Sequence, residues 1–109
     1  MADDGPLGSF EEQVLLGVLR TGEEAYGMAV RREIEAVTGR EVAIGAVYAT
    51  LDRLEAKGLA ASVRAAGGAR RLFTVTRAGL TALAETRAVR DRLWRGVDIA
   101  ALGLGPRPA

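Results

Sequence analysis

The stretch of sequence that decides the fold runs from residue 44 to residue 79 and reads IGAVYATLDRLEAKGLAASVRAAGGARRLFTVTRAG. Its first part predicts a helix that starts near Ile44 and ends at Lys57-Gly58, because apolar residues recur at spacings of three and four. The apolar face consists of Ile44, Val47, Leu51 and Leu54. The remaining side is small, polar and basic, and consists of Ala46, Ala49, Thr50, Arg53 and Lys57. Such a slim front allows close approach to another surface, although a core helix with an ordinary solvated front has the same pattern.

Two runs typical of β-strands follow this helix, and a glycine pair joins them. Residues 59–65 and 70–75 predict the strands, and the turn between them reads Ala66-Gly67-Gly68-Ala69. Short strand-like runs around a glycine pair are typical of a β-hairpin. Arg70 and Arg71 lie beside its tip, and Arg64 lies on the other strand. The sequence therefore predicts a hairpin with a basic end.

Two further helices are predicted before residue 44. Ser9 is expected to cap the first, with Glu12 completing a capping box, and this helix ends at Thr21-Gly22. The second runs from about residue 24 to residue 38, and Gly39 is a suitable residue to end it. Its apolar face consists of Tyr26, Val30, Ile34 and Val37. We expect Tyr26 to lie in the core and to pack the second helix against the third.

A long last helix is predicted from Arg77 to about Val97, with Thr76 as its cap. Three helices, a hairpin and a long helix make a mainly α fold with a small β-hairpin, in the order of a winged helix-turn-helix domain. We expect a flexible N-terminus (1–6), a winged-helix domain (7–76), a C-terminal helix (77–98) and a disordered tail (99–109) that is rich in glycine and proline.

Composition excludes most chemistry. The 109 residues suit one domain, and they include neither histidine nor cysteine, which removes the commonest general base, thiol nucleophiles and thiolate metal sites. The carboxylate pairs Glu11-Glu12 and Glu23-Glu24 sit at predicted helix starts, where they cap or face water, so we expect no enzyme, no cofactor and no metal. The acidic start Met1-Ala2-Asp3-Asp4 has no signal-peptide pattern, and the apolar runs are too short to cross a membrane. A cytoplasmic location is expected.

The near-neutral net charge of +1 conceals an uneven distribution. Residues 1–41 carry a net charge of −5, residues 42–95 carry +6, and the remainder cancels. A basic segment of this kind favours a polyanionic partner, although charge clusters are often only solvated faces. Alanine contributes 20 residues, which bury little area. The thin core that results suggests that a second subunit covers part of the chain.

The sequence resembles the PadR family of bacterial transcriptional regulators over roughly residues 7–95. The stretches that carry the resemblance are Leu7-Gly8-Ser9-Phe10-Glu11, Glu24-Ala25-Tyr26-Gly27-Met28, residues 45–59 (GAVYATLDRLEAKGL) and residues 67–79 (GGARRLFTVTRAG). Two positions depart from the family. Ala43 stands where a serine is common, and Phe73 stands where a tyrosine is usual. The chain after the last helix is short, which resembles the family's shorter branch, whose members dimerise through this helix. Separately, the composition is rich in arginine and alanine, which suggests a GC-rich bacterial genome.

The resemblance implies a homodimeric, sequence-specific DNA-binding regulator, most simply a repressor, that reads double-stranded DNA as an inverted repeat. The third helix would enter the major groove and the hairpin would act as the wing. The residues expected at DNA are Gly45, Ala46, Tyr48, Ala49, Thr50, Arg53, Arg70 and Arg71. Arg53 has the alternative of a structural ion pair, and Arg64 is a weaker candidate. Each wing arginine is expected to add about one to the salt dependence of binding.

The last helix is expected to hold the dimer interface or an effector site. The residues assigned to these roles are Leu83, Arg87, Arg90 and Trp94. Because tryptophan is enriched in buried interfaces, Trp94 suits a dimer anchor. In the family's short branch it would also suit a cavity for a flat aromatic effector, which would release the DNA. The other class that stays open is a winged helix that binds proteins and not DNA, for which the hydroxyl missing at Ala43 is the only sequence argument.

Overall fold

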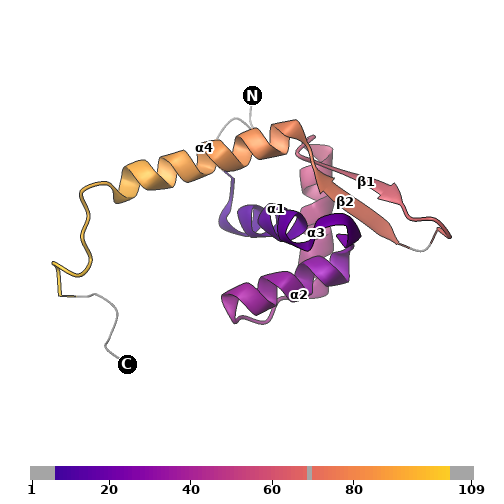
Figure 1. Cartoon of the computed structure of the whole chain (residues 1–109), viewed down its shortest axis with the longest axis horizontal. Coiled ribbons are helices and arrows are strands. Elements are labelled where there is room, and N and C mark those ends of the chain that lie inside the picture. Colours follow the sequence, from indigo (N-terminus) through magenta and orange to yellow (C-terminus); the bar gives the residue numbers. More distant parts are fainter. Residues whose placement is uncertain (1–6, 69, 104–109) are drawn as a thin grey trace.

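The computed structural model describes residues 7–68 and 70–103, and these form four α-helices and one β-hairpin (Figure 1). The elements follow in the order α1 (Ser9–Thr21), the 3₁₀ turn η1 (Gly22–Glu24), α2 (Gly27–Thr38), α3 (Ile44–Ala56), β1 (Ala60–Arg64), β2 (Arg71–Val75) and α4 (Arg77–Trp94). This is the predicted order of three helices, hairpin and long helix. The mainly α winged-helix prediction is confirmed.

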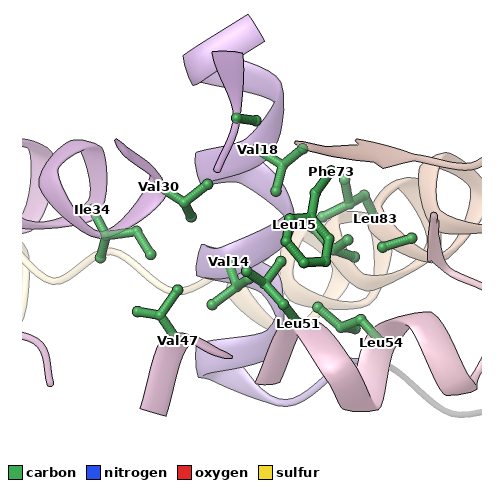
Figure 2. Close-up of a cluster of buried hydrophobic side chains, with 12 residues drawn as sticks. Val14, Leu15, Val18, Val30, Ile34, Val47, Leu51, Leu54, Phe73 and Leu83 are labelled. Atoms are coloured by element: carbon green, nitrogen blue, oxygen red, sulfur yellow. The ribbon is translucent and has the colours of Figure 1, made fainter. Parts of the chain in front are cut away.

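The core forms around α1, which contacts α2, α3 and β2. Val14, Leu15 and Val18 of α1 are buried at helical spacing, and the other helices and β2 close over them (Figure 2). The largest of the fully buried side chains is Phe73 of β2. The core cluster consists of Val14, Leu15, Val18, Ala25, Val30, Ile34, Val47, Leu51, Leu54, Ala60, Phe73 and Leu83. Phe73 is therefore a core residue, and the usual tyrosine at this position would place its ring in the same buried space.

Two helix starts differ from the prediction. Helix α1 begins at Ser9 with Gly8 as its N-cap, and the Gly8 N–H donates to Glu11 Oε1 at 3.0 Å. The reaching glutamate is thus Glu11, and the predicted box of Ser9 with Glu12 is wrong by one residue. Helix α2 begins at Gly27 because Ala25 is buried and its carbonyl oxygen accepts from Phe73 N–H at 2.8 Å. This bond to β2 keeps the backbone before Gly27 out of the helix.

The predicted hairpin is present, with strands slightly shorter than the predicted ranges 59–65 and 70–75. Strands β1 and β2 pair antiparallel, from Ala60 opposite Val75 to Arg64 opposite Arg71. Gly67 and Gly68 have φ values of 92° and 80°, which favour glycine. The turn residue Ala69 lies outside the described residues.

Helix α4 begins as predicted and ends three residues early. Thr76 Oγ1 accepts from Gly79 N–H at 3.0 Å and donates to the Gly58 carbonyl oxygen at 2.7 Å, which confirms Thr76 as the cap. The helix ends at Trp94, shortly before Gly96, whose φ is 81°. Its C-terminal half extends beyond the body formed by α1–α3 (Figure 1).

Most of the residues predicted to form the flexible N-terminus and the disordered tail lie outside the described ranges. Residues 99–103 form hydrogen-bonded turns, such as Leu102 N–H to the Asp98 carbonyl oxygen at 3.3 Å. The flexible segment predicted for 1–6 and the last part of the predicted tail, 104–109, lie outside the described residues. Within the described ranges, no helix combines the length and apolar character needed to cross a membrane.

Candidate DNA interface

The exposed face of α3 consists of small residues beside one tyrosine. Gly45, Ala46, Tyr48 and Ala49 are all exposed. A Cβ added at Gly45 would meet nothing within 4 Å, so the surface in front of this residue is open. The N-cap Ala43 makes no side-chain hydrogen bond, as expected from its missing hydroxyl. Helix α3 therefore presents a narrow front that a groove can accommodate.

Thr50 does not belong to this front. Its side chain is 3% exposed, and its Oγ1 accepts from Arg53 Nη2 at 3.3 Å. The expectation that Thr50 points away from the core is wrong. The sequence contained the signal, because Thr50 lies three residues after Val47 and four before Leu54, on the same stripe.

The ring of Tyr48 packs over the start of α2. A Cβ added at Gly27 would approach Tyr48 Oη to 2.6 Å and would overlap the ring carbons behind it. Only glycine leaves room for this contact. Tyr48 stays 38% exposed and so reaches the front of α3 while it leans on α2.

Tyr26 lies on the side of the wing and not in the core. It is only partly buried, and the guanidinium of Arg70 stacks on its ring, with the guanidinium carbon 3.9 Å from the ring centroid. Its hydroxyl accepts from Arg32 Nη2 at 2.9 Å. The expected role of Tyr26, packing α2 on α3, is thus wrong, and Tyr48 makes that contact. The hydroxyl allows Tyr26 to remain at the surface, where a ring face can hold a cation.

Arg71 is held by the carboxylates of α3. Its Nη1 donates to Asp52 Oδ1 at 3.0 Å and its Nη2 to Glu55 Oε1 at 2.8 Å. Ser62 of β1 also donates to Glu55, at 2.9 Å. Burial lowers the pKa of Arg71, but the bonds to Asp52 and Glu55 raise it by more, so its pKa lies above the ordinary value. This network fixes the wing on α3 and neutralises acidic residues beside the exposed front.

Arg53 and Lys57 converge on one carboxylate of α1. Lys57 Nζ donates to Glu11 Oε2 at 2.9 Å, and Arg53 Nε donates to the same oxygen at 3.4 Å. Burial raises the pKa of Glu11, but bonds from Lys57, Gly8 and Arg53 lower it by more, so the carboxyl titrates below its ordinary range. Arg53 is 52% exposed along its side chain. The ion pair left open for it by the sequence is present.

Of the four residues assigned to the last helix, one is buried and three are exposed. Leu83 is buried in the subunit's own core, so the expectation that it lines an interface or effector site is wrong. Arg90 is exposed and forms an ion pair with Glu12 of α1. Arg87 is exposed. Trp94 is 55% exposed in the half of α4 that extends from the body.

Sequence reasoning missed Tyr26 and Arg32 as neighbours of the wing. The spacing of Tyr26 from Val30 placed it on an apolar face, and nothing in the local pattern marks a bond across to Arg70. Gly27 signals a close contact, but the side chain that packs there is Tyr48 of α3. In the described ranges, no cluster of acidic side chains that could hold a metal ion is found.

The order of elements, the slim front and the basic wing are those of a winged-helix regulator. The family model described as transcriptional regulator PadR-like family matches residues 15–85. The chain belongs to this PadR-like family. The matched segment runs from α1 through the hairpin and into α4, and therefore includes α3 and the wing. The family is one of transcriptional regulators and not of enzymes.

Solved structures share the fold of this chain. The chain is similar to RosR of H. salinarum, at 29% identity and a TM-score of 0.65, over 89% of this chain and 82% of that chain. A PadR family transcription regulator from Clostridium difficile R20291 is 20% identical, with a TM-score of 0.61, over 89% and 100% of the two chains. F93 from STIV, a winged-helix DNA-binding protein, is 17% identical, with a TM-score of 0.60, over 84% and 95%. Among curated proteins, none matches.

Proposed function

We propose that this PadR-like protein is a cytoplasmic, bacterial, homodimeric repressor that binds an inverted-repeat operator and is released by a small-molecule effector. The observation that carries the proposal is the exposed front of α3, where Gly45, Ala46 and Ala49 leave room and Tyr48 projects beside them. Arg70, at the wing, adds a cation that stacks on Tyr26 at the start of α2. DNA recognition needs a slim element for the major groove and cations for the phosphates.

The contacting residues that we propose are Gly45, Ala46, Tyr48, Ala49, Arg53 and Arg70. Thr50 is left out because it is buried. Arg53 keeps a place because half of its side chain is exposed and its bonds to Glu11 and Thr50 are long, at 3.4 and 3.3 Å. Arg71 acts on the wing through Asp52 and Glu55.

The proposed dimer forms through the C-terminal half of α4 and the residues after it. Leu93, Trp94 and Val97 are 72%, 55% and 48% exposed. These are large apolar side chains in a segment that extends from the body (Figure 1). Burial of such a patch against a second copy stabilises association by roughly 25 cal/mol per Å² of apolar surface, before the cost of ordering the two chains.

Selection of bound duplexes from a random DNA pool tests the function. We expect enrichment of an inverted repeat whose half-sites lie about one helical turn apart, because a two-fold dimer presents two copies of α3. Enrichment of a single half-site would contradict the dimeric arrangement. If no sequence is enriched and the protein does not retard its own promoter region, the alternative of a protein-binding winged helix is favoured.

Trp94 provides the test for the effector. It is the only tryptophan in the chain, so its fluorescence reports on one position. We expect planar aromatic compounds to stack on the indole ring, because aromatic pairs gain from buried contact area and from the electrostatics of their π-systems. They should quench the fluorescence in the dimer and weaken operator binding over the same concentrations. Two hollows of about 370 and 230 Å³ lie beside α1 and the end of α2, and Trp94 lines neither of them. A compound that binds in one of these hollows is not expected to stack on Trp94. Unchanged fluorescence across a broad panel of aromatics would contradict an effector site at Trp94.

A further inference from the structure

Two arginines from different elements meet at the ring of Tyr26. The guanidinium carbon of Arg70, from the wing, lies 3.9 Å from the ring centroid, and that of Arg32, from α2, lies 5.9 Å from it. Arg32 also donates to the tyrosine hydroxyl at 2.9 Å. Tyr26 thus gathers two positive charges that are 38 residues apart in the sequence.

No carboxylate within residues 7–68 and 70–103 forms an ion pair with either arginine. Two arginines of α1 and α2 differ in this respect, since Arg20 binds Glu33 at 2.7 Å and Arg31 binds Glu35 at 3.4 Å. Two guanidinium groups near one ring repel each other, and no described carboxylate pairs with either of them to offset this repulsion. Each guanidinium has five N–H donors, and Arg32 uses one of them on Tyr26. An anion with several acceptor oxygens would reduce the repulsion within the pair and accept some of the remaining donors.

The backbone around this pair also favours an anion. Tyr26 is the N-cap of the 12-residue helix α2 and makes no side-chain capping bond. The first N–H groups of a helix carry partial positive charge. The next residue, Gly27, is where the ring of Tyr48 from α3 packs. The cation pair therefore lies at the junction of α2, the exposed front of α3 and the wing.

We propose that Arg32, Arg70 and Tyr26 form a binding site for one phosphate of the DNA backbone, so that the interface extends from α3 and the wing onto the start of α2. The proposal rests on the proposed DNA-binding function. Arg32 and Arg70 contact the phosphate. Tyr26 is a positioning residue, which holds Arg70 by its ring and Arg32 by its hydroxyl.

The test compares Arg32→Gln with Arg20→Gln by titrating the fluorescently labelled duplex recovered from the selection, at several salt concentrations. Both variants lose one positive charge, but Arg20 is already paired with Glu33. For Arg32→Gln we expect operator affinity to fall about tenfold near 0.15 M salt, and the slope of log affinity against log salt to decrease by about one per subunit. Arg20→Gln should stay within about twofold of the wild type.

Variants of Tyr26 test whether this residue positions Arg70 and Arg32 for binding or serves only the stability of the fold. Tyr26→Phe keeps the ring that holds Arg70, so we expect it to bind more tightly than Tyr26→Leu, which holds neither arginine. In a double-mutant comparison, Arg32→Gln and Arg70→Gln should lose less together than the product of their separate losses, because they share one phosphate. If Arg32→Gln binds like Arg20→Gln while the wild type binds its operator, the phosphate site is overturned and the proposed function stands. If the wild type binds no DNA, both fall.

Discussion

Replacement of Gly79 by alanine should lower the free energy of unfolding by about 3 kcal/mol or more, as expected for strong overpacking at a fixed site. A Cβ at this position would overlap the carbonyl oxygen of Leu59 and approach Val75 Cγ1 to 2.7 Å. Neither side can yield easily. The Leu59 oxygen accepts from Thr76 N–H at 3.1 Å, and Gly79 N–H is held by Thr76 Oγ1 at 3.0 Å. Helix α4 must then shift away from the hairpin on which it is seated.

Thermal and urea unfolding measure this loss. For a domain of this size, each kcal/mol corresponds to roughly 4–8 °C, so we expect Tm to fall by about 12–24 °C or more. Gly45→Ala is the matched control, because this helical glycine has open space around it. It should be neutral or more stable by about 0.5–1 kcal/mol, since alanine is the better helix former. A Gly79→Ala protein that melts with the wild type would show that α4 is not tightly seated.

The order and type of the elements could be predicted from local pattern. The stripe of Val47, Leu51 and Leu54 and the glycine pair at 67–68 each reflect interactions within a few residues of sequence, and those depend on spacing alone. The same stripe contains Thr50, which was assigned to the front because it is polar. Its hydroxyl bonds to Arg53, and this allows a polar residue to occupy a core position.

The partners of the charged and aromatic side chains could not be predicted in this way. Arg71 and Arg70 are adjacent, yet one binds Asp52 and Glu55 while the other stacks on Tyr26. Arg71 is the first residue of β2 and Arg70 precedes the strand, and the groups that each side chain meets depend on tertiary packing. The late start of α2 has a similar origin, because the bond from Phe73 to Ala25 comes from a distant strand.

The uneven charge of the sequence overstates the charge available to DNA. Acidic residues of the first part of the chain pair with basic residues of the second, as Glu11 does with Lys57 and Glu12 with Arg90. Arg71 is likewise engaged by carboxylates of α3. The cations without such pairing, above all Arg70, therefore carry more of the proposed phosphate contact than a count of residues indicates.

Operator affinity should fall steeply with salt, and the two wing arginines should differ in their share of that fall. If the dimer contacts about six to ten phosphates, affinity decreases about a thousandfold or more between 50 and 200 mM salt. Arg70→Ala should decrease the slope of log affinity against log salt by about one per subunit, because Arg70 meets a phosphate directly. Arg71→Ala should change the slope by less than half as much, because this side chain is bound to Asp52 and Glu55.

Arg71→Ala should nevertheless weaken binding at every salt concentration. It frees the wing from α3 and leaves two carboxylates beside the exposed front, where they repel the DNA backbone. Titrations of the selected duplex at four or more salt concentrations separate the offset from the slope. Equal slope changes for Arg70→Ala and Arg71→Ala would mean that Arg71 leaves its carboxylates to bind a phosphate. Salt-independent affinity of the wild type would contradict phosphate contacts altogether, because displaced counterions are the source of the slope.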